Sequence, residues 1–407
     1  MHPARALLVG ASAAALLTSC SSAATTSPPT WQPSPSYRPG GGAQASPIIP
    51  IPSGGATDRS AGGTPTPSGS QASPTRPGGP KVDPNVVATN LAAPVGLAML
   101  PDGTALVGER TTGRIVQVQP KAGQPVPTIR TLHGLDAAGD GGLLDLALSP
   151  TYNEDGLVYA YVTTPTDNRV VDFTLTGPVT PVFTGIPKGP SGNTGRILFG
   201  ADGDLYIGTG DAGHPALAGR PNSLAGKVLR VDSIGDPAPG NPTAASPVWS
   251  GGHHVVDGLC PIGTSRWIFE AETGGRGRPD EINLLGRGAY YGWPRIRSGT
   301  AASAAELPVR EGGPGGCAFL DGRLWVTSLN GEALLSAEVR PGVLSPVLRS
   351  FAPVLAHKYG RLRTVVAAPD GALWLTTSNR DGAGTPVAAD ERVIRYLPSA
   401  GAGHEPE

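Results

Sequence analysis

The sequence repeats one short pattern six times, and this repeat constrains the fold more than any other feature. Each copy has an apolar segment, a turn that in most copies contains Asp-Gly, and a second segment rich in Leu, Val, Trp and Tyr. An Asp-Gly turn between alternating apolar runs indicates a β-hairpin. The copies are between 49 and 62 residues apart and begin at Leu97, Leu146, Ile197, Leu259, Cys317 and Val366.

Hairpins repeated at this period cannot bury their own apolar faces, so they must pack against their neighbours. Blades of about four strands, arranged around a central axis, provide that packing. We therefore predict an all-β fold for residues 81–407, a six-bladed β-propeller. Residues 86–90 and 392–397 are extended segments at the two ends, and they would share one blade and close the ring. Two β-sandwich domains are the alternative.

Composition excludes two classes of protein. The chain has 31 Lys and Arg residues against 32 Asp and Glu residues, so its formal net charge is −1. A balanced charge lacks the basic surface that nucleic-acid binding requires, so we expect no nucleic-acid partner. Only 15% of the 407 residues are charged, and there are 59 Gly and 44 Pro residues. This composition argues against a coiled coil or another long-helix protein.

The first twenty residues have the features of an export signal. Arg5 is followed by an apolar run over residues 6–17, which is shorter than the roughly 20 residues needed to span a bilayer. The run ends in Leu17-Thr-Ser-Cys20, which resembles the lipobox of bacterial lipoproteins. The resemblance implies a lipoprotein signal peptide over residues 1–19 and an acylated Cys20, with palmitate or a similar chain as the lipid anchor. An ordinary signal peptide with an incidental cysteine is the alternative.

Two further predictions concern the region after Cys20 and the remaining cysteines. Residues 21–80 are mostly Ser, Pro, Gly, Thr and Ala, a composition that cannot bury enough surface to fold. We therefore expect a disordered stalk over residues 20–80, between a cell membrane and a domain on its extracytoplasmic face. Cys260 and Cys317 are a leftover pair in an exported chain, which favours a disulfide over two buried free thiols.

Several phrases within the repeats carry a resemblance to a known family. They are Gly141-Gly-Leu-Leu-Asp-Leu-Ala-Leu, Gly195-Arg-Ile-Leu-Phe-Gly, Gly208-Thr-Gly-Asp-Ala-Gly, Ser223-Leu-Ala-Gly-Lys-Val-Leu-Arg-Val-Asp, Asp280-Glu-Ile-Asn-Leu, Tyr291-Gly-Trp-Pro, Arg361-Leu-Arg-Thr-Val and Asn379-Arg-Asp-Gly. These phrases resemble the glucose/sorbosone dehydrogenases, and the likeness extends from Val87 to Pro398. This family consists of PQQ-dependent soluble aldose dehydrogenases, which are six-bladed propellers that use calcium. With its lipobox and stalk, the chain also resembles actinobacterial lipoproteins of the LppZ type.

The resemblance implies that the family's catalytic base is missing. In the family a His before the Gly-Arg phrase takes the proton of the sugar hydroxyl, and Gly192 occupies that position here. Glycine cannot take a proton. The Asp that orients the base corresponds to Asp211, and a Gln of the family corresponds to Asp140. Asp211, Asp140 and His254 are therefore the candidate catalytic residues.

The cofactor site implied by the resemblance is partly retained. The Arg pair that holds the carboxylates of PQQ corresponds to Arg361 and Arg363, which point the same way if the segment is a strand. A second basic residue of the family falls near Asn330. The family's Arg-Asn pair becomes His254-Val255, which removes two cofactor contacts.

Calcium is a further expectation from the resemblance. The family's ion binds backbone carbonyls in a loop that corresponds to Gly274-Gly275. Acidic residues nearby offer hard oxygen ligands, although solvated acidic residues are the alternative. Since adjacent strand residues face opposite sides, at most one of His253 and His254 points into the central channel. A metal site at these residues or at His214 competes with a structural, hydrogen-bonded histidine. The acidic residues are Glu270, Glu272, Asp280 and Glu281.

Three functions remain open from the sequence. The first is a membrane-anchored propeller that has lost the family's base and binds a sugar, a cell-envelope glycan or a protein. The second is an active PQQ- and calcium-dependent sugar dehydrogenase, with Asp140 or His254 as the base. The third is a different propeller chemistry, such as a calcium-dependent lactonase.

Overall fold

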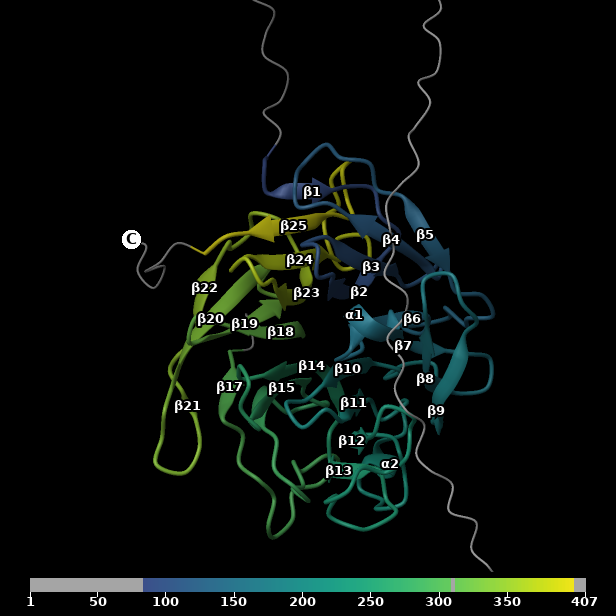
Figure 1. The fold of residues 1–407 in the computed structure, drawn as a ribbon. Coiled ribbons are helices and arrows are strands. Elements are labelled where there is room, and N and C mark those ends of the chain that lie inside the picture. The colour runs from purple at the N-terminus through teal and green to yellow at the C-terminus, as the bar shows by residue number, and fades with distance from the viewer. Residues whose placement is uncertain (1–82, 309–311, 399–407) are drawn as a thin grey trace, which may run out of the picture. The chain divides into compact units, whose positions relative to one another are not determined.

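The computed structural model describes residues 83–308 and 312–398, and these residues are almost entirely β-structure. They form six antiparallel sheets, which Figure 1 shows arranged around a common centre. The predicted six-bladed β-propeller is therefore confirmed, and the alternative of two β-sandwiches is wrong. The predicted signal peptide, Cys20 and stalk lie outside the described residues. Within the described part, no helix is long and apolar enough to cross a membrane.

The blades follow one another along the chain, and each begins with its innermost strand. Blade one contains β2 (Pro94–Met99), β3 (Ala105–Glu109), β4 (Arg114–Val118) and β5 (Thr128–Thr131). Blade two contains β6 (Leu143–Leu148), β7 (Val158–Thr163), β8 (Asn168–Phe173) and β9 (Thr180–Ile186). Blade three contains β10 (Gly195–Phe199), β11 (Leu205–Thr209), β12 (Lys227–Val231) and β13 (Val248–Gly251).

The remaining blades have the same order, with two additions. Blade four contains β14 (Val255–Pro261), β15 (Ile268–Thr273), β16 (Asp280–Leu284) and β17 (Ala305–Leu307). Blade five contains β18 (Pro314–Leu320), β19 (Arg323–Ser328), β20 (Ala333–Arg340) and β21 (Val347–Leu348), and β22 (Ala352–Val354) also pairs with β20. Blade six contains β23 (Leu362–Ala367), β24 (Leu373–Thr377), β25 (Val393–Tyr396) and β1 (Val86–Ala88). Two one-turn helices lie in loops, α1 (Tyr152–Asp155) and α2 (Pro215–Ala218).

The repeated hairpin of the sequence is the inner hairpin of each blade. In blade one Leu97 pairs with Val107, and in blade six Val366 pairs with Trp374. The turn between these strands needs a left-handed residue, which Gly371 supplies in blade six with φ of +80°. The repeat therefore marks the two strands that lie nearest the centre.

The apolar core lies between adjacent blades. Trp325 and Trp374, from the second strands of blades five and six, are at most 2% exposed. The blades approach very closely where Gly195 faces the blade before it. A Cβ at Gly195 would lie 2.1 Å from the ring of Tyr161, so only glycine fits there. This contact explains the glycine of the Gly195-Arg phrase.

A strand pairing and a disulfide connect parts of the ring that are distant in the sequence. β1 pairs with β25, with Val86 opposite Ile394, so the first and last described strands share one blade, as predicted. A disulfide joins Cys260 on β14 to Cys317 on β18, with their Cα atoms 5.7 Å apart. It connects the innermost strands of blades four and five, and it confirms the pairing predicted from the sequence.

Candidate functional site

The candidate site residues gather at one end of the central channel. In each blade the innermost strand begins at this end, and the second strand, which is antiparallel to it, ends there. Residues just before an innermost strand or just after a second strand therefore meet. We call this end the channel mouth, and it contains Asp140, Gly192, Asp211, His254, Asn330 and Arg361.

His254 and Asp211 lie together at the channel mouth. His254 Nε2 is 3.8 Å from Asp211 Oδ2, and His254 Nδ1 is 3.0 Å from the carbonyl oxygen of Thr273. Since a carbonyl only accepts, Nδ1 carries the hydrogen, and a neutral ring has its lone pair on Nε2. The His254 side chain is 24% exposed, whereas Asp211 is buried. The imidazole is therefore held from one side and open on the other.

Trp293 completes this pair. Its Nε1 donates to Asp211 Oδ2 at 3.0 Å, and its ring packs on the His254 ring with centroids 4.5 Å apart. The other carboxylate oxygen, Asp211 Oδ1, accepts from the backbone amide of Gly213 at 2.8 Å. The carboxylate is thus fixed by two donors.

Gly192 lies directly beside Asp211 and has a left-handed backbone, with φ of +67°. A Cβ at this position would lie 2.9 Å from Asp211 Oδ1. The Gly192 amide donates to Asp140 Oδ2 at 2.7 Å, and the Asn193 side chain donates to Asp140 Oδ1 at 2.6 Å. Asp140 therefore holds the loop that carries Gly192 and does not project freely into the channel.

The two predicted arginines have different surroundings. Arg361 donates to Asp381 Oδ2 at 2.9 Å and to the carbonyl oxygen of Leu329 at 3.1 Å. Arg363 is half-buried, and its side chain donates no hydrogen bond to another residue of the described ranges. Burial lowers the pKa of Arg363, and the charge of nearby Asp257 raises it. Asn330, near which the resemblance would place a basic residue, is exposed.

A layer of charged residues crosses the channel inside the mouth. Arg196 Nη1 is 3.5 Å from Asp145 Oδ1, and Arg196 Nε donates to the carbonyl oxygen of Asp257 at 2.6 Å. Burial raises the pKa of Asp145 to about 6, although Arg196 acts in the opposite direction. Burial likewise raises the pKa of Asp257 to about 6, against its hydrogen bonds from Thr273. Sequence analysis missed this layer, and the signal was a charged residue inside three otherwise apolar inner strands.

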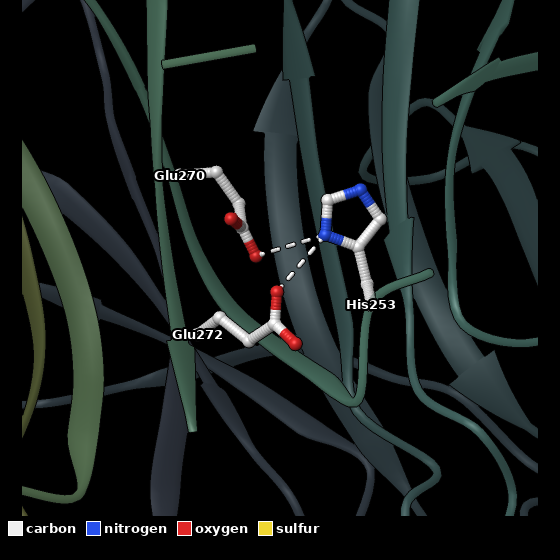
Figure 2. A group of neighbouring side chains, drawn as sticks. All are labelled: His253, Glu270 and Glu272. Atoms are coloured by element: carbon white, nitrogen blue, oxygen red, sulfur yellow. Dashed lines mark hydrogen bonds and ion pairs between the residues drawn. The ribbon is translucent and has the colours of Figure 1, made fainter. Parts of the chain in front are cut away.

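A second polar cluster lies inside blade four and is drawn in Figure 2. His253 Nδ1 is 3.0 Å from Glu272 Oε2 and 3.6 Å from Glu270 Oε1, and all three residues are buried. Burial alone would lower the pKa of His253, but the two carboxylates raise it to about 9. Burial and the charge of Glu270 raise the pKa of Glu272 to about 7, against the effect of His253. The alternative that these acidic residues are solvated is therefore wrong for Glu270 and Glu272.

Comparison with known proteins identifies the family. The model of the family described as "Glucose / Sorbosone dehydrogenase" matches residues 91–315, more than half of the chain. The chain belongs to the glucose/sorbosone dehydrogenase family. A solved structure of the PQQ-bound aldose sugar dehydrogenase from Streptomyces coelicolor is 39% identical, with a TM-score of 0.71, over 76% of this chain and 95% of that one.

Two curated relatives match over a shorter part of their length. An uncharacterized protein from Synechocystis is 31% identical over 53% of this chain and 60% of its own length. Quinoprotein glucose dehydrogenase B from Acinetobacter calcoaceticus is 28% identical over 53% of this chain and 52% of its own length. The chain thus spans between half and two thirds of these two relatives.

The channel mouth fits the family's quinone only in part. PQQ carries several carboxylates, which are held best by charge-assisted hydrogen bonds. Arg363 has donors available for one carboxylate. Arg361 is already bound to Asp381, and the position of the second basic residue holds Asn330. The residues present therefore do not form a complete grip on PQQ.

The predicted calcium loop is packed tightly. A Cβ on Gly275 would lie 1.9 Å from the Trp293 ring, so this glycine is required by packing. The amide of Gly274 donates to Asp280 Oδ1 at 2.7 Å, and Asp280 Oδ2 accepts from the amide of Gly313 at 2.6 Å. Asp280 therefore fastens two loops through both of its oxygens. Calcium binding at Gly274 and Gly275 stays a prediction.

The structure separates the three histidines that the sequence singled out. His253 is buried in the blade, and His254 reaches the channel mouth, as the alternation of side chains predicts. His214 precedes α2 and takes no part in either cluster. Trp293 was missed because its contact with Asp211 joins residues 82 positions apart, and only the fold brings them together.

Proposed function

We propose that this chain is a lipid-anchored, extracytoplasmic member of the family that binds a sugar or a cell-envelope glycan at the channel mouth without the family's proton-abstracting base. One observation carries this proposal. Gly192 stands where the resemblance puts the base, and its left-handed backbone and its contact with Asp211 leave no room for a side chain. This packing supports the proposal that position 192 carries no base.

The channel mouth retains groups that bind hydroxyls. His254 Nε2 and the carboxylate of Asp211 are acceptors, and the unbonded guanidinium of Arg363 is a donor. A sugar offers several hydroxyls that both donate and accept. The mouth thus supports recognition of a polyhydroxy ligand, whereas transfer of hydride to PQQ would need a more complete cofactor grip.

A second candidate, an active sugar dehydrogenase, is favoured by the geometry of His254. Its Nδ1 is fixed by the Thr273 carbonyl, and its Nε2 faces both Asp211 and solvent. A base whose protonated nitrogen is held by an acceptor, leaving the lone pair of the other nitrogen for the substrate, suits proton abstraction from a sugar hydroxyl. In this candidate His254 takes the role that Gly192 cannot fill.

Calorimetry on the full chain distinguishes the two candidates. The full chain is titrated with PQQ in the presence of Ca²⁺, and separately with a panel of aldoses and cell-wall glycan fragments. The binding function predicts glycan or sugar binding, no saturable PQQ binding and no quinone-dependent oxidation. Saturable PQQ binding with sugar turnover that is lost in His254→Gln would establish the dehydrogenase instead.

The lipid anchor has its own test. Replacing the thiol in Cys20→Ala removes the atom that would be acylated, so the protein should move from the membrane fraction to the soluble exported fraction and lose labelling by a palmitate analogue. Thr25→Ser changes a residue outside the lipobox and keeps the thiol, so it serves as a control. Unchanged membrane association in Cys20→Ala would overturn the anchor.

A further inference from the structure

The cluster in blade four contains more negative charge than its partners neutralise. His253, Glu270 and Glu272 are 0%, 0% and 5% exposed, and their candidate ligand atoms all lie within 4.8 Å of one another. Among the described ion pairs, the only cation that contacts Glu270 or Glu272 is His253. When both carboxylates are ionised, even a protonated imidazole leaves one negative charge without a counter-ion. Such a charge is costly in a protein interior.

Two oxygen atoms at this cluster also lack hydrogen bonds. Glu270 Oε1 and Asn283 Oδ1 are buried, and neither has a hydrogen-bond partner in the described part of the chain. Asn283 is fully buried and belongs to the cluster, because its Nδ2 donates to Glu270 Oε2 at 2.9 Å. Buried polar atoms without a partner are rare and usually mark a missing water or ion.

We propose that this cluster binds one divalent transition-metal ion, with Zn²⁺ as the best fit, through His253 Nδ1, Glu270 Oε1 and Glu272 Oε2. The ion neutralises both carboxylates and gives the free oxygen of Glu270 a partner. In tetrahedral Zn²⁺ sites the metal–ligand bonds are about 2.0–2.2 Å long, so neighbouring ligand atoms lie about 3.3 Å apart. The observed distances from Nδ1, 3.0 Å to Glu272 and 3.6 Å to Glu270, bracket this value.

The donor set selects the class of metal. Imidazole together with carboxylates suits Zn²⁺ and its first-row neighbours. Ca²⁺ takes six to eight oxygen ligands, and this cluster offers a nitrogen and few oxygens. The side-chain donors of this cluster therefore differ from the backbone carbonyls expected to bind calcium at Gly274 and Gly275.

The surroundings hold the ligands in place. His253 Nε2 is 2.9 Å from Ser250 Oγ, which fixes the ring so that Nδ1 faces the two carboxylates. Such outer contacts typically orient a ligating histidine. The other oxygen of Glu272 accepts from the backbone amide of His254 at 2.5 Å. An ion bound here would thus stabilise the segment that carries His254 to the channel mouth, whatever that mouth binds.

The test is metal binding to the full chain after removal of metals with a chelator. We expect one equivalent of Zn²⁺ to bind per chain and the unfolding temperature to rise with Zn²⁺ concentration. Glu270→Gln keeps the shape of the side chain but removes a charged ligand, so Zn²⁺ affinity should fall by at least about 100-fold. Glu306→Gln removes an exposed carboxylate from β17 of the same blade and should bind Zn²⁺ like the unaltered chain.

A second measurement needs no variant. Co²⁺ in a four-coordinate site with a histidine ligand gives intense visible absorption, which added Zn²⁺ should abolish at one equivalent. Absence of stoichiometric Zn²⁺ binding, or a Co²⁺ spectrum like that of the free aquo ion, would overturn the site. Equal Zn²⁺ affinity in Glu270→Gln would overturn the assignment of its ligands.

Discussion

Gly192→Ala tests whether the base position is committed to glycine by packing. The variant places a Cβ on a backbone with φ of +67°, which costs an L-residue about 1–2 kcal/mol. The same Cβ would lie 2.9 Å from Asp211 Oδ1, so the buried carboxylate must move. That movement strains its hydrogen bonds from Gly213 and Trp293, and hydrogen bonds to charged groups are worth about 1.5–3 kcal/mol. Partial loss of these bonds adds about 1–2 kcal/mol.

Gly103→Ala provides the matched control. Gly103 has φ of +82°, and a Cβ there would meet nothing within 4 Å, so only the backbone cost applies. Urea unfolding of both variants should therefore show Gly192→Ala to be less stable than Gly103→Ala by about 1–2 kcal/mol. Equal loss of stability in the two variants would mean that the Asp211 carboxylate can move away from the added Cβ without losing its hydrogen bonds. A histidine would then fit at position 192, and our account of the missing base would be wrong.

Two further predictions concern the buried charges and the disulfide. Burial raises the pKa of Asp145 and of Asp257 from 3.8 to about 6 in the folded chain, so the folded state binds protons more tightly than the unfolded state, and stability falls as pH rises from about 4 to about 6. In Asp145→Asn this fall, measured by urea unfolding at pH 4.5 and 7, should be smaller by about 2 kcal/mol, and an unchanged pH dependence would refute the assignment. The disulfide between Cys260 and Cys317 closes a loop of sequence separation 57, which restricts the unfolded chain. Replacing both cysteines by Ala should therefore lower the free energy of unfolding by about 4 kcal/mol. A loss below about 1 kcal/mol would show that this bond does not restrain the unfolded chain.

The propeller could be predicted because its signals are local. The Asp-Gly turns mark the hairpins directly. The number of copies gives the number of blades, and their spacing leaves room for about four strands in each. The end strands followed from the same repeat, whereas the disulfide was predicted from the leftover cysteine pair, which the structure places on neighbouring inner strands. Each of these features depends on short-range sequence and on one regular architecture.

The site was predicted less completely because burial is set by the neighbouring blades. Glu270 and Glu272 alternate with Phe269 and Ala271, which reads as a strand with one solvated face. In a propeller both faces of a blade are covered, so these glutamates are buried. The resemblance to the family placed Asp211 and His254, but their contact with Trp293 comes from the loop between β16 and β17 of blade four, which is 82 positions from Asp211 in the chain.

The pairing of β1 with β25 has a consequence for how the domain folds. The inner strands of blades one and six, β2 and β23, are in contact, and the sheet of blade six is complete only when β1 is added. Blade six therefore cannot form its outer edge until residues more than 300 positions apart in the chain have met, at Val86 and Ile394. The outer edge of blade six is therefore completed only after β25 has been synthesised, and a chain that stops before β25 leaves β1 without the strand it pairs with.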